Sequence, residues 1–311
     1  MATPILAVAG STGAQGGGLV RAALADRSFA VRALTRKPDS PKALELKKLG
    51  AEVVAADLDD VDSLRAAFQG ASAAYAVTNF WEHFSADKEI AQAGNLARAA
   101  REAGVKHVVW STLEDTRLLV PLSDDRMPTL GGKWKVPHFD GKGEADRLFK
   151  ELPTTYLLTS FYWDNLIHFG MGPKKGPDGR LAFTLPMADK KLPGIAAADI
   201  GACALGVLQR GPELVGKRVG IAGDHLTGAQ MAAQLSEALG QPVAYNAVTP
   251  AAYRAFGFPG AEDLGNMFQY KADFEREFCG ARDLAFSRQL HPKLQTFGRW
   301  LAAHKSEIPV T

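Results

Sequence analysis

Short apolar runs alternate with amphipathic stretches through residues 1–160, and this alternation constrains the fold more than any other feature of the sequence. The runs typical of strands are residues 5–8, 31–34, 52–55, 74–77, 106–110 and 155–158. The stretches typical of helices between them include residues 17–25, 42–49, 61–68 and 86–103. Strands this apolar, separated by helices, indicate a parallel sheet that is covered on both faces. Because such connections are short and right-handed, the pattern predicts an α/β fold with a doubly wound Rossmann sheet.

The pattern loosens after residue 160. A turn-rich link spans residues 173–179. Further strands are expected at residues 180–185, 219–222 and 243–246, and helices at residues 199–209, 227–239 and in several segments between 250 and 305. We therefore predict two domains, residues 1–160 and 161–311. The second is a smaller α/β lobe that forms a cleft at the carboxyl edge of the sheet, and some of its elements can return to the main sheet.

One connection in the first domain is unusually long. Residues 111–138 show no helical or strand pattern and contain loop formers such as Pro121, Pro128 and the pair Gly131-Gly132. A patternless connection of this length is usually functional or mobile. It follows the fifth predicted strand, at the edge where open sheets bind ligands, so one interpretation is a lid over residues 115–137. A plain surface insertion is the alternative, and the sequence does not decide between them.

The composition excludes several classes of protein. Hydrophobic residues make up 46% of the 311 residues and charged residues 23%, which is typical of a globular chain. The 36 lysines and arginines against 34 acidic residues give a net charge of +2, too balanced to predict nucleic acid or a membrane surface as a partner. The two cysteines make neither a disulfide framework nor a zinc site. No apolar run is as long as a membrane span, which needs about 18–20 residues. Residues 1–10 lack a signal-peptide pattern. We expect a soluble, cytoplasmic protein without a metal site.

A glycine-rich loop joins the first predicted strand to the first helix. Its sequence is Gly10-Ser-Thr-Gly-Ala-Gln-Gly16. Glycines at such a loop permit a positive φ and let the backbone approach a pyrophosphate closely. The helix that follows directs its N–H groups and the positive end of its dipole at the anion. Its position after an apolar strand makes this a specific signal for a dinucleotide.

The end of the second predicted strand favours NADP over NAD. Arg36 lies twenty residues after Gly16 and is followed by Lys37, where an NAD-binding chain would carry an acid. An arginine offers a planar pair of donors to the 2′-phosphate of NADP. After the next two strands, Asp57 and Leu58 are expected to border the adenine. Thr78, Asn79 and Phe80 are expected to border the ribose and nicotinamide.

The usual catalytic pair of short-chain reductases is absent from the sequence. None of the six tyrosines has a lysine four residues later. His138 and Lys142 occupy the expected place instead, and Ser111, at the end of the fifth strand, supplies a hydroxyl. An imidazole, with an ordinary pKa near ~6.5, can donate a proton at neutral pH, so one hypothesis makes His138 the proton donor. The alternative is that His138 only shapes the pocket.

Other chemistries find no support in the sequence. The remaining histidines include no pair spaced for helical metal ligation, and no nucleophile elbow is present. Cys203 lies in an apolar helical stretch and is expected to be inert. The aromatic residues at predicted strand ends line either an apolar pocket or the ordinary core; they are Phe80, Trp81, Phe161, Tyr162 and Trp163.

Several motifs together carry a family resemblance. They are residues 10–17, residues 31–36, residues 77–82, His138-Phe-Asp-Gly-Lys-Gly-Glu144 and the stretch from Gly257 to Phe268. With them the chain resembles the NmrA-like family of atypical short-chain dehydrogenase/reductase proteins, and in particular its branch of redox sensors. The resemblance implies a Rossmann domain that holds NADP(H), a smaller domain that closes a cleft, and a response to the NADPH/NADP ratio through conformation and association.

The resemblance also assigns roles to individual residues. The pyrophosphate would be held by Gly10, Thr12, Gly13, Ala14, Gln15 and Gly16. The 2′-phosphate would be held by Arg36 and Lys37, the adenine by Asp57 and Leu58, the middle of the cofactor by Thr78 and Asn79, and the nicotinamide ribose by Lys142 with Tyr162 and Asn165 nearby. Residues 117–137 depart from the family pattern by their length, which leaves the partner surface open.

Two functional hypotheses follow. The first is an NADP(H)-binding redox sensor or regulator that acts through a protein partner, with a homodimer as one candidate assembly. The second is an NADPH-dependent reductase of quinones, carbonyls or imines that uses His138 and Lys142 in place of tyrosine and lysine. A small apolar substrate belongs to the second hypothesis.

Overall fold

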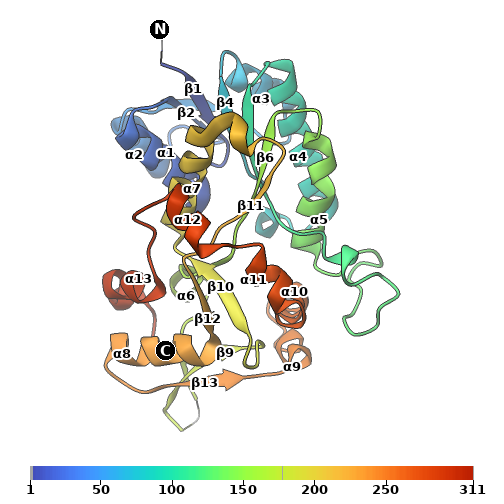
Figure 1. Ribbon diagram of the computed structural model, residues 1–311, viewed down its shortest axis with the longest axis vertical. Helices are drawn as coiled ribbons and strands as arrows, with labels where there is room; N and C mark the ends of the chain where they lie inside the picture. Colours follow the sequence, from blue (N-terminus) through green and yellow to red (C-terminus); the bar gives the residue numbers. More distant parts are fainter. Residues whose placement is uncertain (1–2, 177, 311) are drawn as a thin grey trace.

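A seven-stranded parallel sheet forms the centre of the larger part of the molecule in the computed structural model, which describes residues 3–176 and 178–310 (Figure 1). Its strand order is β11-β6-β5-β4-β1-β2-β3. The strands are β1 (Ile5–Val8), β2 (Ala30–Thr35), β3 (Glu52–Ala55), β4 (Ala73–Ala76), β5 (His107–Thr112), β6 (Thr154–Leu158) and β11 (Arg218–Gly220). The prediction of a doubly wound Rossmann sheet is confirmed.

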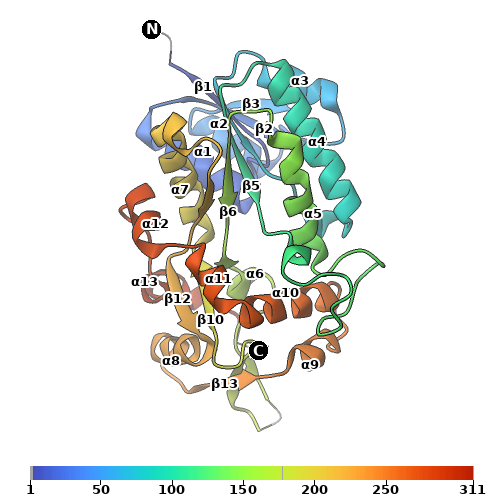
Figure 2. The same ribbon diagram turned by 45° about the vertical axis from the view of Figure 1, so that its right-hand side comes forward.

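Helices cover both faces of this sheet, as the apolar strands require. One face carries α1 (Ala14–Asp26), α2 (Pro41–Lys48) and α7 (Ala197–Arg210). The other carries α3 (Val61–Phe68), α4 (Ala86–Glu102) and α5 (Pro137–Ala145). Figure 2 shows these two layers on either side of the strands. The carboxyl ends of the strands point toward the smaller C-terminal part, which places ligand-binding loops between the two.

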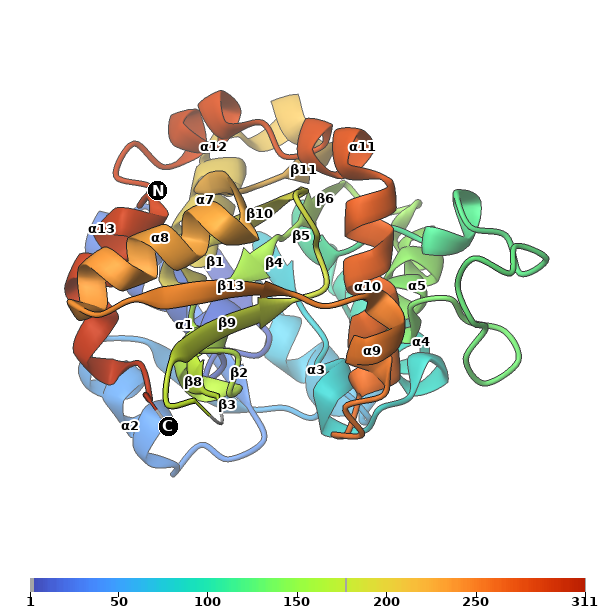
Figure 3. The ribbon, with the colours of Figure 1, turned by 90° about the horizontal axis from the view of Figure 1, so that it is seen from below.

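The C-terminal part is built around two small sheets. The first contains β7 (Phe161–Tyr162), β10 (Lys191–Ile195) and β12 (Asp224–Thr227); the second contains β8 (Lys174–Lys175), β9 (Leu181–Leu185) and β13 (Val243–Ala247). The helices are α6 (Asn165–His168), α8 (Gly228–Leu239), α9 (Pro250–Arg254), α10 (Ala261–Asp273), α11 (Glu275–Gly280), α12 (Leu284–Leu290) and α13 (Phe297–His304). Seen from below, β13 and β9 lie beside α8 at one end and α9 with α10 at the other (Figure 3).

Two elements that follow residue 160 belong to the larger part: β11 is the edge strand of the main sheet next to β6, and α7 packs against α1. The larger part is therefore not confined to residues 1–160. The structure also contains β10 and β12, which the sequence did not predict. In β10 the pair Pro193-Gly194 is of the kind that usually interrupts a strand.

Residues 115–137 form an anchored insertion beside α5 and α10 (Figure 3). The buried Asp140 carboxylate accepts hydrogen bonds from the backbone N–H groups of Thr116 and Lys135, each at 2.8 Å. The Lys135 ammonium in turn donates to the carbonyl oxygens of Asp124 (2.7 Å) and Met127 (2.8 Å). Both ends of the insertion and its middle are therefore tied to one carboxylate and one ammonium.

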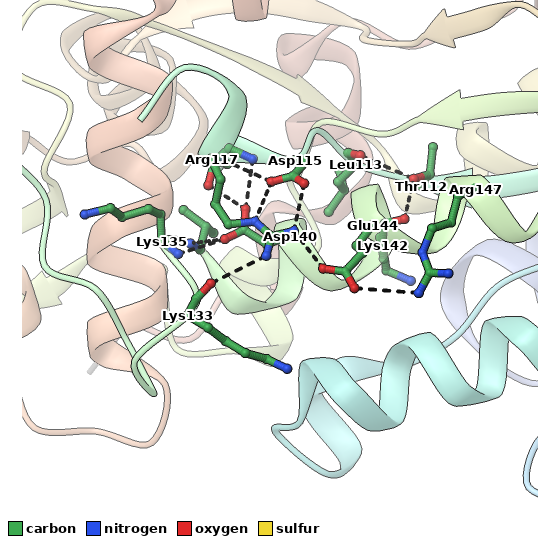
Figure 4. A network of polar contacts seen from close by, with 12 residues as sticks. Thr112, Leu113, Asp115, Arg117, Lys133, Lys135, Asp140, Lys142, Glu144 and Arg147 are labelled. Atoms are coloured by element: carbon green, nitrogen blue, oxygen red, sulfur yellow. Dashed lines mark hydrogen bonds and ion pairs between the residues drawn. The ribbon is translucent and has the colours of Figure 1, made fainter. Parts of the chain in front are cut away.

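A second set of contacts lies at the surface of the same insertion (Figure 4). The Arg117 guanidinium pairs with Asp115 at 2.8 Å and with Glu144 on α5 at 2.9 Å. These carboxylates raise the pKa of Arg117 by hydrogen bonding. The pairs fix the start of the insertion against α5.

A membrane-spanning helix is not found among residues 3–176 and 178–310, since none there combines the length and the apolar character that a span requires.

Candidate functional site

A cavity of about 1630 Å³ lies at the carboxyl ends of β1, β2, β4 and β5 and continues toward the C-terminal helices. Every residue that the sequence predicted for the site lines it. They are Gly10, Thr12, Gly13, Ala14, Gln15, Gly16, Arg36, Lys37, Asp57, Leu58, Thr78, Asn79, Phe80, Ser111, His138, Lys142, Tyr162 and Asn165. In the described structure residues 115–137 contribute nothing to this lining. The segment lies outside the cavity lining in this structure, and its interpretation as a lid or as a surface insertion stays a prediction.

The glycine-rich loop is shaped as an anion cradle. Gly10 adopts a φ of +61°, and a Cβ on Gly16 would lie 2.4 Å from the Gly10 carbonyl oxygen. Ser11 ties the loop to β2 by donating to the Leu34 carbonyl at 2.7 Å. At the start of α1, Gly13 offers no side-chain cap and the first turn contains no acid. The N-terminus of α1 is therefore open to an anion that lies in the cavity.

Gln15 connects three hydroxyl groups beneath this loop. Its Oε1 accepts from the Ser111 hydroxyl at 2.7 Å and from the Tyr75 hydroxyl, and its Nε2 donates to the Tyr162 hydroxyl at 2.5 Å. Burial raises the pKa of both tyrosines, so both stay protonated at neutral pH. The Ser111 hydroxyl is directed at Gln15, and its role in the structure is to position that side chain.

Arg36 and Lys37 line the cavity directly after β2, but Arg36 is already paired. Its Nη1 lies 2.6 Å from the Oε1 of Glu82, in the 3-10 helix Phe80–Glu82. The hydrogen bond to Glu82 raises the pKa of Arg36. Both side chains are about half exposed, at 57% and 45%, so solvent weakens the pair. A phosphate that binds in the plane of the Arg36 guanidinium would compete with the Glu82 carboxylate for its N–H groups.

Lys142 belongs to a buried network at the middle of the cavity. Its ammonium lies 2.6 Å from Glu89 Oε1 and donates to the Thr78 hydroxyl at 2.8 Å. The Thr78 hydroxyl donates to the same Glu89 oxygen at 2.6 Å. Glu89 is fully buried on α4, and its second oxygen lies 3.7 Å from His83 Nε2, neither atom having a hydrogen-bond partner among the described residues. Lys142 is thus held at the cavity wall by a carboxylate that compensates its charge.

His138 is fixed by a carboxylate from the C-terminal part. Asp263 on α10 lies 2.6 Å from His138 Nδ1 and also accepts from the His138 backbone N–H at 3.2 Å. The imidazole packs against Trp81 and Phe139, each with ring centroids 4.8 Å away. Because Asp263 accepts a hydrogen bond, Nδ1 carries a proton and Nε2 is the nitrogen left for a ligand. The arrangement orients His138 at the cavity wall.

Beyond His138 the cavity is lined by many apolar side chains, together with a few polar ones such as Thr159, Ser160 and Asn246. Its lining includes Leu113, Phe139, Phe161, Tyr253, Phe256, Phe258, Leu264 and Met267. Of the aromatic residues considered from the sequence, Phe80, Trp81, Phe161 and Tyr162 line the cavity, which supports the pocket interpretation for these four. Trp163 does not, because it packs in the core with Phe297 and Trp300.

The family model described as the NmrA-like family matches residues 3–301. The chain belongs to the NmrA-like family. An NmrA-like family domain-containing oxidoreductase of Cladobotryum sp, FrzB, is 30% identical over 86% of this chain and 84% of its own length. An NAD(P)H azoreductase of Xenophilus azovorans is 30% identical over 79% of this chain and 77% of its own length.

Solved structures agree with the fold. NmrA, a negative transcriptional regulator, in its complex with NADP aligns with a TM-score of 0.76 at 24% identity over 97% of this chain and 95% of that one. A Citrobacter sp. triphenylmethane reductase complexed with NADP(H) aligns with a TM-score of 0.74 at 20% identity over 96% and 99% of the two chains. A protein described as a regulator and one described as a reductase thus share this fold.

Four charged residues at the site were not predicted from the sequence: Glu82, Glu89, Asp263 and Lys271. Glu89 carried a signal, since it lies three residues after Ala86 on the buried face of α4. Asp263 lies in the family stretch that ends at Phe268, but nothing local pairs it with His138. Among the described residues, no group of three or more histidine, cysteine or acidic side chains is arranged to hold a metal ion.

Proposed function

We propose that this protein is an NADP(H)-dependent reductase. The observation that carries the proposal is that one cavity joins an anion cradle at α1 to an apolar, aromatic half with an oriented histidine. The second half gives room for an acceptor beside the cofactor. Cavities with an apolar lining and a few placed polar groups are the usual sites of small-molecule substrates.

The cradle fits a dinucleotide. Gly16 leaves room where a side chain would collide with Gly10, and the start of α1 supplies donors for the pyrophosphate. Arg36, Lys37 and Lys142 line the cavity. We assign the first two to the 2′-phosphate and Lys142 to the hydroxyls of the nicotinamide ribose. NmrA has been solved with NAD and with NADP, which makes either cofactor compatible with the fold. For this chain the basic pair favours NADP.

NADPH, when bound, supplies a hydride, and an acceptor in the aromatic half is reduced. The protein must exclude water, orient the acceptor and provide a proton. His138 is the proton donor in the sequence-based hypothesis, and Asp263 would hold its Nε2 toward the cavity. We propose quinones, carbonyls and imines as the acceptor classes. The reductases among the relatives, which act on other conjugated compounds by name, support this choice.

The test is NADPH oxidation by the purified protein at saturating cofactor, against a panel of quinones, aldehydes, ketones and imines. We expect turnover with at least one class. His138→Ala should reduce kcat by about 100-fold or more if the imidazole donates the proton, and by less than about tenfold if another group donates it and His138 only shapes the wall. In both cases the dissociation constant for NADPH should stay unchanged. Lys142→Ala should instead weaken NADPH binding. An absence of turnover across the panel, with tight NADPH binding, would contradict the reductase.

A redox sensor of the NADPH/NADP ratio is the second candidate. Two ion pairs favour it, because Arg36–Glu82 and Lys142–Glu89 link separate elements across the cofactor half of the cavity. A cofactor that displaces either carboxylate changes how these elements are connected, which is the differential contact that a sensor needs. Sedimentation velocity with NADPH and with NADP tests it. A ratio-dependent association state without turnover would favour the sensor, and an unchanged state would contradict it.

A further inference from the structure

One lysine in the wall of the aromatic half has no oxygen to bind. Lys271 on α10 is 3% exposed, lines the cavity, and its ammonium contacts the Met267 sulfur at 3.2 Å. The two other buried lysines differ. Lys135 donates to two backbone carbonyl oxygens, and Lys142 binds a hydroxyl and a carboxylate. Among the described residues, no oxygen accepts a hydrogen bond from Lys271.

Aromatic rings surround this ammonium instead. The Lys271 nitrogen lies 5.4 Å from the ring centroid of Phe139, 5.6 Å from that of Phe268 and 5.3 Å from that of Phe278. Such contacts attract a cation, but they do not replace the oxygen acceptors of three N–H donors. A buried ammonium that lacks acceptors is costly, and an oxygen brought by a ligand would remove that cost.

The charged groups around Lys271 are already engaged with other partners. Arg282, which follows α11, lies 3.5 Å above the Phe278 ring and binds both oxygens of Glu114 at 2.7 and 3.1 Å. On α5, the Asp140 carboxylate is taken up by the anchored insertion. Burial and the Arg282 charge lower the pKa of Lys271 to about 7, against the opposing effect of Glu114. The amine therefore exchanges its proton near neutral pH.

We propose that Lys271 binds the oxygen of the acceptor and gives it a proton, and that the acceptor is a flat aromatic or conjugated carbonyl compound. The proposal rests on the reductase function. The rings of Phe139 and Phe161, which line the cavity, give the flat part of the acceptor its surfaces, and the ammonium is the buried charged group there that selects an oxygen.

The Lys271 ammonium first donates a hydrogen bond to the carbonyl oxygen and polarises it. When the carbonyl π pair moves onto oxygen on reduction of the acceptor by the nicotinamide, one N–H bond of Lys271 breaks and one O–H bond forms. The neutral amine then recovers a proton from water. This gives Lys271 the transfer that the sequence-based hypothesis assigns to His138, and His138 remains a wall residue held by Asp263.

The test measures binding apart from turnover. 2-Naphthoate, a flat aromatic carboxylate that is ionised above about pH 5.5, is titrated by calorimetry into the full-length protein, first alone and then with saturating NADP. Lys271→Met keeps the length and apolar character that the surrounding rings require. Lys271→Gln keeps a donor without the charge, and Lys293→Met is the exposed control. Thermal melts establish that each variant is folded.

We expect Lys271→Met to bind 2-naphthoate about 10- to 100-fold more weakly, from the strength of a charge-assisted hydrogen bond, with NADPH affinity unchanged. Wild-type affinity should fall as the pH rises through about 7, because the amine loses its charge there, and Lys271→Met should show no such fall. Equal binding by wild type and Lys271→Met, a flat wild-type pH profile, or no wild-type binding at all would each overturn the proposal. Wild-type turnover is measured separately with the acceptor panel, so a failure of the reductase function is distinguished from a failure of Lys271.

Discussion

The pair between Arg36 and Glu82 yields a quantitative prediction for cofactor selectivity. Arg36→Ala removes the donor proposed for the 2′-phosphate of NADPH, which NADH lacks. A hydrogen bond to a charged group contributes about 1.5–3 kcal/mol, so we expect NADPH to bind about 10- to 150-fold more weakly. NADH affinity should change by less than about twofold, because NADH carries no 2′-phosphate for the guanidinium to bind.

Glu82→Gln should have the opposite and smaller effect. The Arg36–Glu82 pair is about half exposed on both sides, and such pairs contribute about 0–1 kcal/mol. Removal of the competing carboxylate should therefore tighten NADPH binding by at most about fivefold. In Arg36→Ala protein the same substitution should do nothing. Glu45→Gln is the matched control, because Glu45 forms a comparably exposed pair with Arg21 away from the cavity.

The assay is a titration of NADPH and NADH fluorescence at fixed ionic strength, since surface charges are screened by salt. The deciding quantity is the ratio of the two dissociation constants in each variant. Equal weakening of NADPH and NADH in Arg36→Ala would refute the assignment of Arg36 to the 2′-phosphate. A Glu82→Gln effect that persists in Arg36→Ala would refute the competition.

Three further predictions concern stability and the phosphate loop. The folded-state pKa of Lys271 is about 7, below its ordinary value of 10.5. Between these pH values the unfolded chain binds more protons than the folded one, so the wild-type protein gains stability as the pH rises. The advantage of Lys271→Met in free energy of unfolding should therefore shrink by about 2–3 kcal/mol from about pH 7 to about pH 9, and a constant difference in urea melts would contradict this. Glu114→Gln leaves the fully buried Arg282 uncompensated and should cost about 3–5 kcal/mol in the same melts, whereas a loss below about 1 kcal/mol would show that the pair is not structural. Gly16→Ala places a Cβ against the Gly10 carbonyl and should abolish NADPH binding in a fluorescence titration, and retained affinity would argue against the cradle.

The phosphate loop and the sheet could be predicted because their information is local. The strand β1, the loop from Gly10 to Gly16 and α1 follow one another in the chain, and hydrophobic periodicity fixes each of them. The same holds for Arg36, which directly follows β2. All these residues meet at one cavity because the carboxyl ends of parallel strands share one edge of the sheet.

The acceptor half could not be predicted in the same way. His138 and Asp263 are 125 residues apart, and only the packing of α10 against α5 brings them together. Lys271 lies on an amphipathic helix where a lysine is usually solvated, and its burial depends on rings from α5, α10 and α11. The pattern of α10 alone does not show which of its faces is covered.

The anchored insertion illustrates a third case. Its length and its loop formers were evident, but a lid and a surface insertion have the same composition. The position of the segment in the structure depends on Asp140, which lies after the segment in sequence and accepts hydrogen bonds from both of its ends. Hydrogen bonds that a folded loop makes to a neighbouring helix leave no periodic trace in the sequence.

A single-turnover reaction of the cofactor-bound protein tests directly whether the cavity holds NADPH and an acceptor together. Protein with one equivalent of NADPH is mixed with an acceptor in a stopped-flow instrument, and the experiment is repeated with NADPH deuterated at the transferred position. We expect bound NADPH to be oxidised in one exponential phase, which is slower by about twofold or more with deuterium if hydride transfer limits it. Bound NADPH that stays reduced with every acceptor of the panel would contradict a cavity that holds cofactor and acceptor together.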